Sequence, residues 1–227
     1  MTNPWISRLR VRGFFHGRRR MHMNVLFINS CMREEQSRTL KIAQAFLEEL
    51  KSGSHQPVIT EKNLMDLNPP YLTRESLKKR NELIEKKEYT HPMFELAHEF
   101  AQADAVVIAA PMWEFSFPAV LRAYIENISV AGITFRYTDS GSVGMCRASK
   151  LLFITSRGAD FAEGPMKEYE MGERYLQAVS GMYGIDEVSC LAADGLDEYY
   201  MRTDAIVADT VKRAKELAAD WKITENS

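Results

Sequence analysis

The chain alternates short apolar runs with longer segments of helical periodicity, and this alternation constrains its fold more than any other feature. The apolar runs predict strands at Asn24–Asn29, Pro57–Glu61, Asp104–Ala110, Lys150–Thr155 and Glu187–Ala193. Helical spacing predicts helices from Ser37 to Leu50, over Glu75–Glu88 and Pro92–Ala103, from Pro118, over Pro165–Tyr183, and from about Glu198 to Trp221. Strands that alternate with helices in this way form βαβ units and a parallel sheet that helices cover. The chain is therefore predicted to have an α/β fold.

Five such strands suit a flavodoxin-like, doubly wound parallel sheet in the order 2-1-3-4-5, with helices on both faces. In that order a ligand binds outside the carboxyl ends of the strands, where the winding reverses between the first and third strands. Three segments therefore matter most for function. They are residues 30–39 after the first strand, 111–117 after the third and 156–164 after the fourth.

Length and composition fit one large domain, which we expect to span residues 23–227. Hydrophobic residues make up 45% of the 227 and charged residues 26%, values that fit a disordered chain, a collagen or a coiled coil badly. The longest uncharged apolar stretch, Ala105–Trp113, is far shorter than the roughly 20 residues of a membrane span, so no membrane partner is expected. Three widely spaced cysteines argue against a disulfide framework and favour the cytoplasm.

Charge is distributed unevenly along the chain. Residues 1–22 carry six arginines and no acidic residue, which leaves 23 basic and 31 acidic residues elsewhere, a net charge of −8. A body with that charge repels a phosphate backbone, so no nucleic-acid partner is expected. We interpret residues 1–22 as a disordered, spurious or vestigial leader, with a targeting peptide as the alternative.

The first of the three segments can bind a phosphate. Ser37 is placed to cap the following helix, and Ser30, Arg38 and Thr39 add hydroxyl groups and a positive charge close to that helix N-terminus. An ordinary capping serine with solvated charges is the alternative. No GxGxxG or GK[ST] element is near, so the dinucleotide and nucleoside-triphosphate fingerprints are absent. The monophosphate of a ligand such as FMN fits better.

The other two segments can hold a flat ring. Pro111, Met112, Trp113, Glu114 and Phe115 place aromatic side chains and backbone amides at the sheet edge, although such aromatics can equally be core residues beneath a loop. Small residues around Gly158 let the backbone approach a ligand closely, although the same residues also suit a plain strand-to-helix turn.

Three stretches, in order, resemble the FMN-dependent NADH-azoreductase family of flavodoxin-like quinone reductases. They are residues 110–115 (APMWEF), 131–138 (AGITFRYT) and 154–158 (ITSRG). The resemblance spans roughly residues 23–194. It implies bound FMN, NADH or NADPH as electron donor, a small-molecule acceptor and a homodimer with FMN sites near the interface.

The resemblance also assigns roles to residues. The loop that contacts the isoalloxazine edge in that family corresponds to Met112, Trp113, Glu114 and Phe115. Its Ser-Arg-Gly-Gly loop, at the pyrimidine end of the ring, corresponds to Ser156, Arg157, Gly158 and Ala159. Its phosphate loop corresponds to Ser30, Ser37, Arg38 and Thr39. The chain departs from the family pattern in having Glu114 in place of an asparagine, and arginines and glutamates in the phosphate loop.

The activity expected is a ping-pong transfer of two electrons from NADH or NADPH to quinones or azo compounds. No protein nucleophile is needed and no metal is expected, since the flavin carries the hydride. Phe135 and Tyr137 are predicted to line the pocket mouth, with packing beneath a loop over residues 134–144 as the alternative. Two other functions stay open: a flavodoxin-like carrier of single electrons, which the long segments 63–90 and 131–148 disfavour, and a reductase that releases its FMN.

Overall fold

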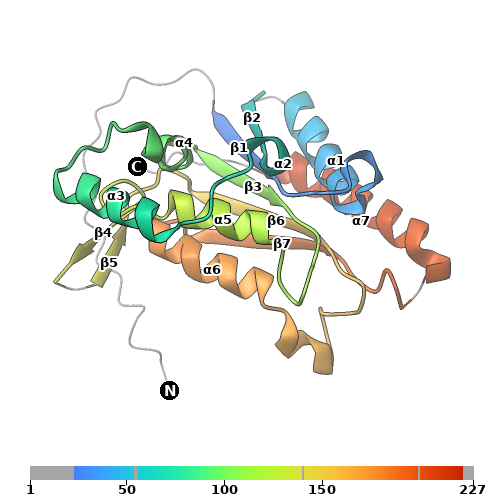
Figure 1. Cartoon of the computed structure of the whole chain (residues 1–227). Coiled ribbons are helices and arrows are strands. Elements are labelled where there is room, and N and C mark those ends of the chain that lie inside the picture. The colour runs from blue at the N-terminus through green and yellow to red at the C-terminus, as the bar shows by residue number, and fades with distance from the viewer. Residues whose placement is uncertain (1–22, 54–55, 140, 199, 222–227) are drawn as a thin grey trace.

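Five parallel strands form the centre of the fold, in the order β2-β1-β3-β6-β7 (Figure 1). The structure is a computed structural model that describes residues 23–53, 56–139, 141–198 and 200–221, so the predicted leader lies outside the described residues. The strands are β1 (Asn24–Asn29), β2 (Val58–Asn63), β3 (Ala105–Ala109), β6 (Lys150–Ser156) and β7 (Glu187–Ala193). The predicted strand order is confirmed, with β6 and β7 as the fourth and fifth strands of the sheet.

A small antiparallel hairpin lies where the sequence pattern predicts a loop. It consists of β4 (Phe135–Thr138) and β5 (Gly141–Gly144), with Phe135 paired to Gly144 and Thr138 to Gly141. Aromatic and β-branched residues favour extended backbone, and Gly141 has a φ of 121°, which glycine adopts readily. The description of residues 134–144 as a loop was therefore wrong.

Helices surround the sheet. They are α1 (Arg38–Ser52), α2 (Leu64–Leu67), α3 (Arg74–Glu85), α4 (Glu95–Gln102), α5 (Ala119–Ile128), α6 (Gly172–Tyr183) and α7 (Thr203–Asp220). Short 3-10 turns cover Glu34–Gln36, Pro92–Phe94, Pro165–Tyr169 and Tyr200–Arg202. None of the described helices is long and apolar enough to cross a membrane.

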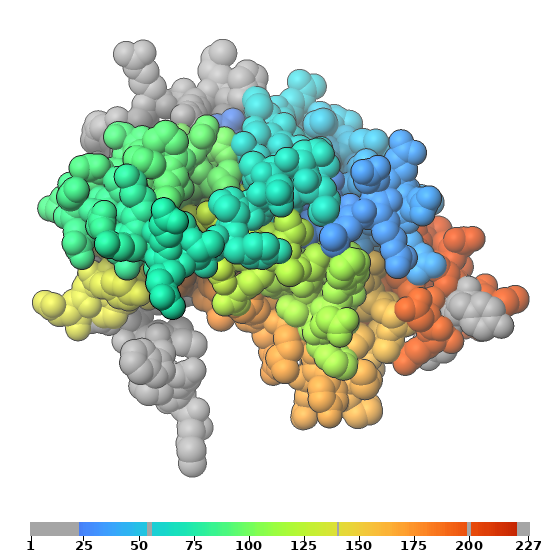
Figure 2. All heavy atoms as spheres, viewed as in Figure 1, coloured from blue at the N-terminus to red at the C-terminus, as the bar shows by residue number. Residues whose placement is uncertain are grey.

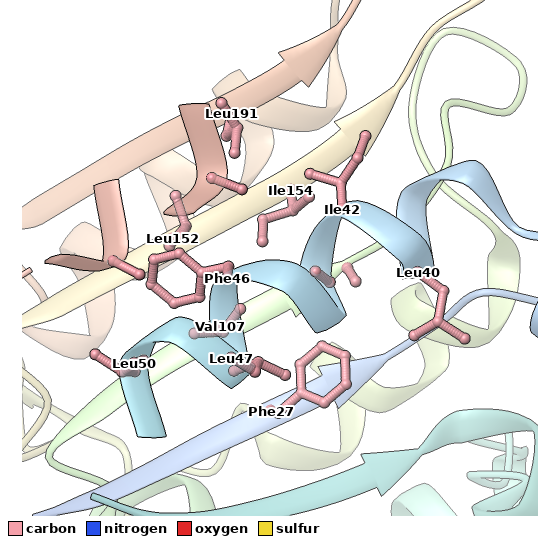
Figure 3. Packing of buried hydrophobic residues seen from close by; sticks show 14 of the residues in the cluster. Phe27, Leu40, Ile42, Phe46, Leu47, Leu50, Val107, Leu152, Ile154 and Leu191 are labelled. Carbon is pink, nitrogen blue, oxygen red and sulfur yellow. The ribbon is translucent and has the colours of Figure 1, made fainter. Parts of the chain in front are cut away.

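Alternation along the strands divides the core in two. Val25 and Phe27 of β1 belong to a cluster with side chains of α1 and α7, whereas Leu26 and Ile28 belong to a cluster with α5 and α6. Successive residues of a strand point to opposite faces, so these two helix pairs pack on opposite faces of the sheet. Figure 3 shows the first cluster, in which Phe46 of α1 lies among side chains of the sheet.

Three helices begin at least three residues later than predicted, and one of them is α4, which starts at Glu95 after a 3-10 turn over Pro92–Phe94. The predicted helix over Pro165–Tyr183 starts as a 3-10 turn, and α6 begins at Gly172. The carboxylate of Glu170 accepts hydrogen bonds from the Glu173 amide at 3.1 and 3.0 Å, and this cap fixes the start of the helix. The last helix begins at Thr203 rather than at Glu198.

Candidate functional site

The three segments predicted to bind a ligand meet at the carboxyl edge of the sheet. The Ser30 amide, after β1, donates to the carbonyl oxygen of Ala109 at 2.9 Å. The Met112 amide, after β3, donates to the carbonyl oxygen of Ser156 at 3.0 Å. The sequence prediction that these loops lie together is therefore consistent with the contacts between them.

The first segment combines a helix N-terminus with an unsatisfied hydroxyl group. Ser37 caps α1, and its Oγ accepts a hydrogen bond from the Leu40 amide at 3.1 Å. The Oγ of Ser30 is fully buried and has no hydrogen-bond partner among the described residues. The partial positive charge of a helix N-terminus attracts anions, so this segment can bind a phosphate.

Asn29 shapes the same turn, although no sequence motif points to this residue. Its Oδ1 accepts a hydrogen bond from the Cys31 amide at 3.0 Å, and its Nδ2 donates to Glu61 Oε1 at 2.9 Å. The turn after β1 is thereby tied to β2. Arg38 lies at the rim, half exposed, with its guanidinium 3.8 Å from a carboxylate oxygen of Asp197.

The segment after β3 forms a tight turn with a strained backbone. Trp113 and Ser116 exchange two backbone hydrogen bonds, of 3.3 and 2.8 Å. Between them Glu114 has a φ of 48° and Phe115 a φ of 64°, in the left-handed region that such residues seldom occupy. The turn holds the side chains of Trp113 and Phe115 about half exposed at the edge of the sheet.

The aromatic turn packs against the segment that leads into α6. The Phe115 carbonyl oxygen accepts a hydrogen bond from the Met171 amide at 2.9 Å, and the Phe115 ring lies 5.8 Å from that of Tyr169. Figure 2 shows these two segments side by side, in yellow-green and orange, at the lower edge of the molecule. Contacts between residues so far apart in sequence carry no local sequence signal.

An apolar pocket of about 850 Å³ opens beside the aromatic turn, at the N-terminal ends of α5 and α6. Trp113 and Phe117 line it from the turn, Arg122 from α5, Tyr175 from α6, and Met171 from the position just before α6. The Arg122 guanidinium lies 4.6 Å from the centre of the Tyr175 ring, a cation–π geometry. The helix residues of this pocket were not predicted from the sequence.

The segment after β6 is fixed by the segment after β7. The Arg157 carbonyl oxygen accepts from the Leu196 amide at 3.1 Å, and the Gly158 carbonyl oxygen from the Asp197 amide at 2.8 Å. A Cβ at Gly158 would lie 2.6 Å from Asp197 Oδ2, the end of an exposed side chain, so a larger residue here would displace Asp197. Ser156, Gly158 and Ala159 are all partly exposed at the sheet edge.

Arg157 differs from its neighbours because its side chain is buried, with 4% exposed. Its guanidinium lies 3.4 Å from carboxylate oxygens of Glu170, Glu173 and Asp194. Burial raises the pKa of Asp194, and the charge of Arg157 opposes that rise. The sequence motif located Arg157 but gave no sign of its acidic partners.

The three cysteine thiols, of which Cys31 lies in the segment after β1, stay protonated at neutral pH. Burial raises the pKa of Cys31 to about 11 and that of Cys146 to about 12, and it also raises the pKa of Cys190. The three thiols are therefore poor nucleophiles at neutral pH. Among the described residues, no group of three or more His, Cys, Asp or Glu side chains is arranged to hold a metal ion.

Phe135 and Tyr137 do not join the other predicted residues within one chain. Their hairpin packs against the C-terminal end of α6, where Gly144 contacts Gly184, whereas the aromatic turn contacts the N-terminal end of the same helix. Phe135 is buried in the core, and Tyr137 is 75% exposed. The structure therefore brings together the residues predicted on three segments and leaves these two apart.

Comparisons with known proteins agree with the fold. The family model of the flavodoxin-like fold matches residues 23–218. An FMN-dependent NADH:quinone oxidoreductase 2 of Clostridium acetobutylicum is 40% identical over 199 residues, which cover 87% of this chain and 98% of that protein. An FMN-dependent NADH:quinone oxidoreductase of Clostridium perfringens is 37% identical, over 86% of this chain and 97% of that protein.

Two solved structures are similar over nearly the same range. An azoreductase from Bacillus anthracis has a TM-score of 0.80 at 26% identity and covers 88% of this chain and 100% of its own. An FMN-dependent NADH-azoreductase from the same species, in complex with FMN, has a TM-score of 0.76 at 26% identity, over 86% of this chain and 98% of its own. The chain therefore belongs to the flavodoxin-like family that includes the FMN-dependent NADH:quinone oxidoreductases.

Proposed function

We propose that this protein is an FMN-dependent oxidoreductase that passes two electrons from NADH to quinones or azo compounds in a ping-pong cycle. The observation that carries the proposal is the meeting of three segments, after β1, β3 and β6, at the carboxyl edge of a flavodoxin-like sheet. The relatives named above, which carry FMN and NADH in their names, support the same cofactor and donor here. We further propose that the sheet is doubly wound and that residues 23–227 form one domain.

The residues present fit FMN, which has a single phosphate. The buried Oγ of Ser30 is free to donate a hydrogen bond, and the capped N-terminus of α1 begins at Arg38. A phosphate at this place gains a hydroxyl donor, helix amides and a nearby guanidinium, so we assign Ser30, Ser37, Arg38 and Thr39 to it. FAD would add a second phosphate, for which these segments offer no second site of this kind.

The other two segments would hold the ring. When bound, FMN supplies the redox chemistry by accepting a hydride from NADH and giving two electrons to the acceptor. The turn at Glu114 and Phe115 would offer backbone amides to the edge of the ring, and the small residues Gly158 and Ala159 would let the opposite segment approach it. We assign Pro111, Met112, Trp113, Glu114, Phe115, Ser156, Arg157, Gly158 and Ala159 to the ring. The apolar pocket beside Trp113 suits a flat, uncharged acceptor.

We also propose a homodimer in the cytoplasm. Tyr137 is exposed and lies at the far end of α6 from the loops of its own chain. Its predicted place at a pocket mouth, with Phe135 behind it at a ring distance of 5.3 Å, therefore requires the loops of a second copy. The three cysteines are unpaired, as a reducing compartment favours.

The test is to release and identify the cofactor of the purified protein and then to follow NADH oxidation with and without a quinone. We expect FMN, and NADH oxidation that accelerates strongly when the quinone is added. FAD as the released cofactor, or no flavin affinity, would overturn the proposal. Accumulation of a one-electron state would point to a carrier, and loss of FMN after reduction to a reductase that releases its flavin.

A further inference from the structure

Arg157 lies within the segment proposed to hold the pyrimidine end of the ring, yet its side chain points into the protein. It is among the most buried charged side chains described, and its partners come from two other elements: Glu170 and Glu173 from the start of α6, and Asp194 from the end of β7. The neighbouring Ser156 side chain reaches Thr39 of α1, on the other face of the sheet. Successive residues of an extended segment point in opposite directions, so the guanidinium lies on the α6 side.

Glu170 connects Arg157 to the aromatic turn. Both oxygens of its carboxylate accept from the Glu173 amide, which fixes Glu170 at the N-terminus of α6. The next residue, Met171, donates its amide to the carbonyl oxygen of Phe115 at 2.9 Å. The ion pair between Arg157 and Glu170 therefore joins the segment after β6 to the turn after β3 through one short stretch of backbone.

Asp194 makes the second connection. Its Oδ1 lies 3.4 Å from Arg157 Nη1 and accepts a hydrogen bond from the Phe161 amide at the same distance. The Phe161 ring in turn lies 6.4 Å from that of Phe115, edge to face. Two separate routes thus lead from the guanidinium of Arg157 to the same aromatic side chain.

Removing a buried cation that faces three carboxylates leaves those charges without compensation, which costs far more than a surface ion pair. The carboxylates are anchored on different elements, so their repulsion would push the start of α6 away from the end of β7. The aromatic turn, bonded to the start of α6, would move with it.

We propose that Arg157 is a positioning residue, whose guanidinium acts through Glu170 and Asp194 to hold the aromatic turn and residues 156–159 at the spacing that the flavin ring needs, without touching the flavin. The inference rests on the proposed function. It refines the role that the family resemblance gave to Arg157: the backbone of this residue stays at the ring, and its side chain supports the site from behind.

The experiment is a double-mutant cycle on FMN affinity. Arg157→Met, Glu170→Gln and the double variant are prepared as apoproteins, and the dissociation constant of FMN is measured by fluorescence titration together with the visible circular dichroism of the bound flavin. Glu170→Gln removes the charge and replaces one carboxylate oxygen with an NH2 group, and it keeps the other oxygen to accept from the Glu173 amide. We expect each single variant to weaken FMN binding about tenfold and to change the circular dichroism in the same way, and the double variant to bind no more weakly than Arg157→Met alone.

Lys150→Met is the matched control. Lys150 is also a buried cation with a carboxylate partner, Glu187 at 3.0 Å, but it stands at the amino end of β6, whereas Arg157 follows the carboxyl end. We expect Lys150→Met to lower the urea midpoint of unfolding while leaving the FMN dissociation constant within twofold of wild type. If Arg157→Met does not fold, Arg157→Lys replaces it in the cycle, because an ammonium cannot bridge the carboxylates as the planar guanidinium does.

Three results would overturn the proposal. One is FMN affinity in Arg157→Met equal to that of wild type. A second is an FMN dissociation constant that is normal in Glu170→Gln but raised in Arg157→Met. A third is a double variant in which the two fold-changes in the FMN dissociation constant multiply. Either of these two results would mean that the guanidinium acts on FMN independently of Glu170. Wild-type protein that does not bind FMN would overturn the proposed function as well, so the two failures are distinguishable.

Discussion

The hydroxyl groups of Thr39 and Ser156 lie 2.6 Å apart and share a hydrogen bond, although 117 residues separate them in the chain. Thr39 is fully buried in the first turn of α1, and Ser156 ends β6. The bond ties the segment proposed to hold the phosphate to the segment proposed to hold the ring. The two halves of the candidate site are therefore coupled through side chains as well as through the sheet.

Thr39→Val is expected to weaken both stability and cofactor binding. Valine has nearly the shape of threonine, so the change removes the hydrogen bond and leaves Ser156 Oγ without this partner, at a cost of about 1–3 kcal/mol in the free energy of unfolding. FMN affinity is expected to fall severalfold in fluorescence titration. Thr210→Val, which removes the buried bond from Thr210 Oγ1 to the Ile206 carbonyl oxygen in α7, should leave FMN affinity unchanged.

Ser30→Ala is expected to weaken FMN binding without lowering the stability of the apoprotein. The Ser30 hydroxyl has no partner in the described residues, so its removal should leave the free energy of unfolding of the apoprotein unchanged or raise it by about 1 kcal/mol. FMN should bind about tenfold more weakly, whereas riboflavin, which lacks the phosphate, should bind as it does to wild type. Ser180→Ala removes another unpartnered buried hydroxyl and should alter neither affinity. Equal losses for FMN and riboflavin would place the phosphate elsewhere.

Glu114→Asn is expected to stabilise the apoprotein. Glu114 has a φ of 48°, a left-handed conformation that asparagine adopts more easily than glutamate. Urea unfolding should show a gain of about 0.5–1 kcal/mol. Glu163→Asn is the control. Glu163 is also exposed but does not have a positive φ, so this change should alter the free energy of unfolding little. No gain at residue 114 would mean that the turn is not strained by its side chain.

Stability is expected to fall at alkaline pH because of Cys31. Burial raises its pKa from 9.0 to about 11, so the folded state favours the protonated thiol. This stabilisation is fully present below pH 9 and is lost as the pH rises through 11. The loss by pH 11 amounts to about 2 kcal/mol in the free energy of unfolding. The free energy of unfolding, measured by urea at pH 9 and at pH 11, should fall more in wild type than in Cys31→Ala. Identical losses in the two proteins would contradict the assignment.

Kinetics test whether donor and acceptor use one site in turn. Double-reciprocal plots of rate against NADH, at several quinone concentrations, are expected to be parallel, as in other ping-pong cycles. Intersecting lines would mean that both substrates bind together. The same plots for Tyr137→Ala should stay parallel, with a raised KM for the quinone if this side chain lines the mouth of a partner's pocket.

The sequence by itself determined the sheet and the location of the loops that we propose bind the cofactor. Strands buried on both faces, such as Ala105–Ala109, have continuous apolar sequences. The helix from Arg38 is indicated by its serine cap and by the spacing of its apolar residues. These are local signals, since propensity, periodicity and capping act over a few neighbouring residues. The strand order and the three ligand segments follow from them together with the geometry of parallel sheets.

Tertiary structure alone decided what those loops contact. The motif that contains Arg157 predicted a contact with the cofactor. The burial of its side chain among three carboxylates depends instead on how α6 and β7 pack against β6. The hairpin of Phe135 and Tyr137 was likewise placed at the far end of α6 by long-range packing. Contacts between distant segments form only when the whole chain folds, because their energy comes from burial and charge pairing that no stretch of sequence contains alone.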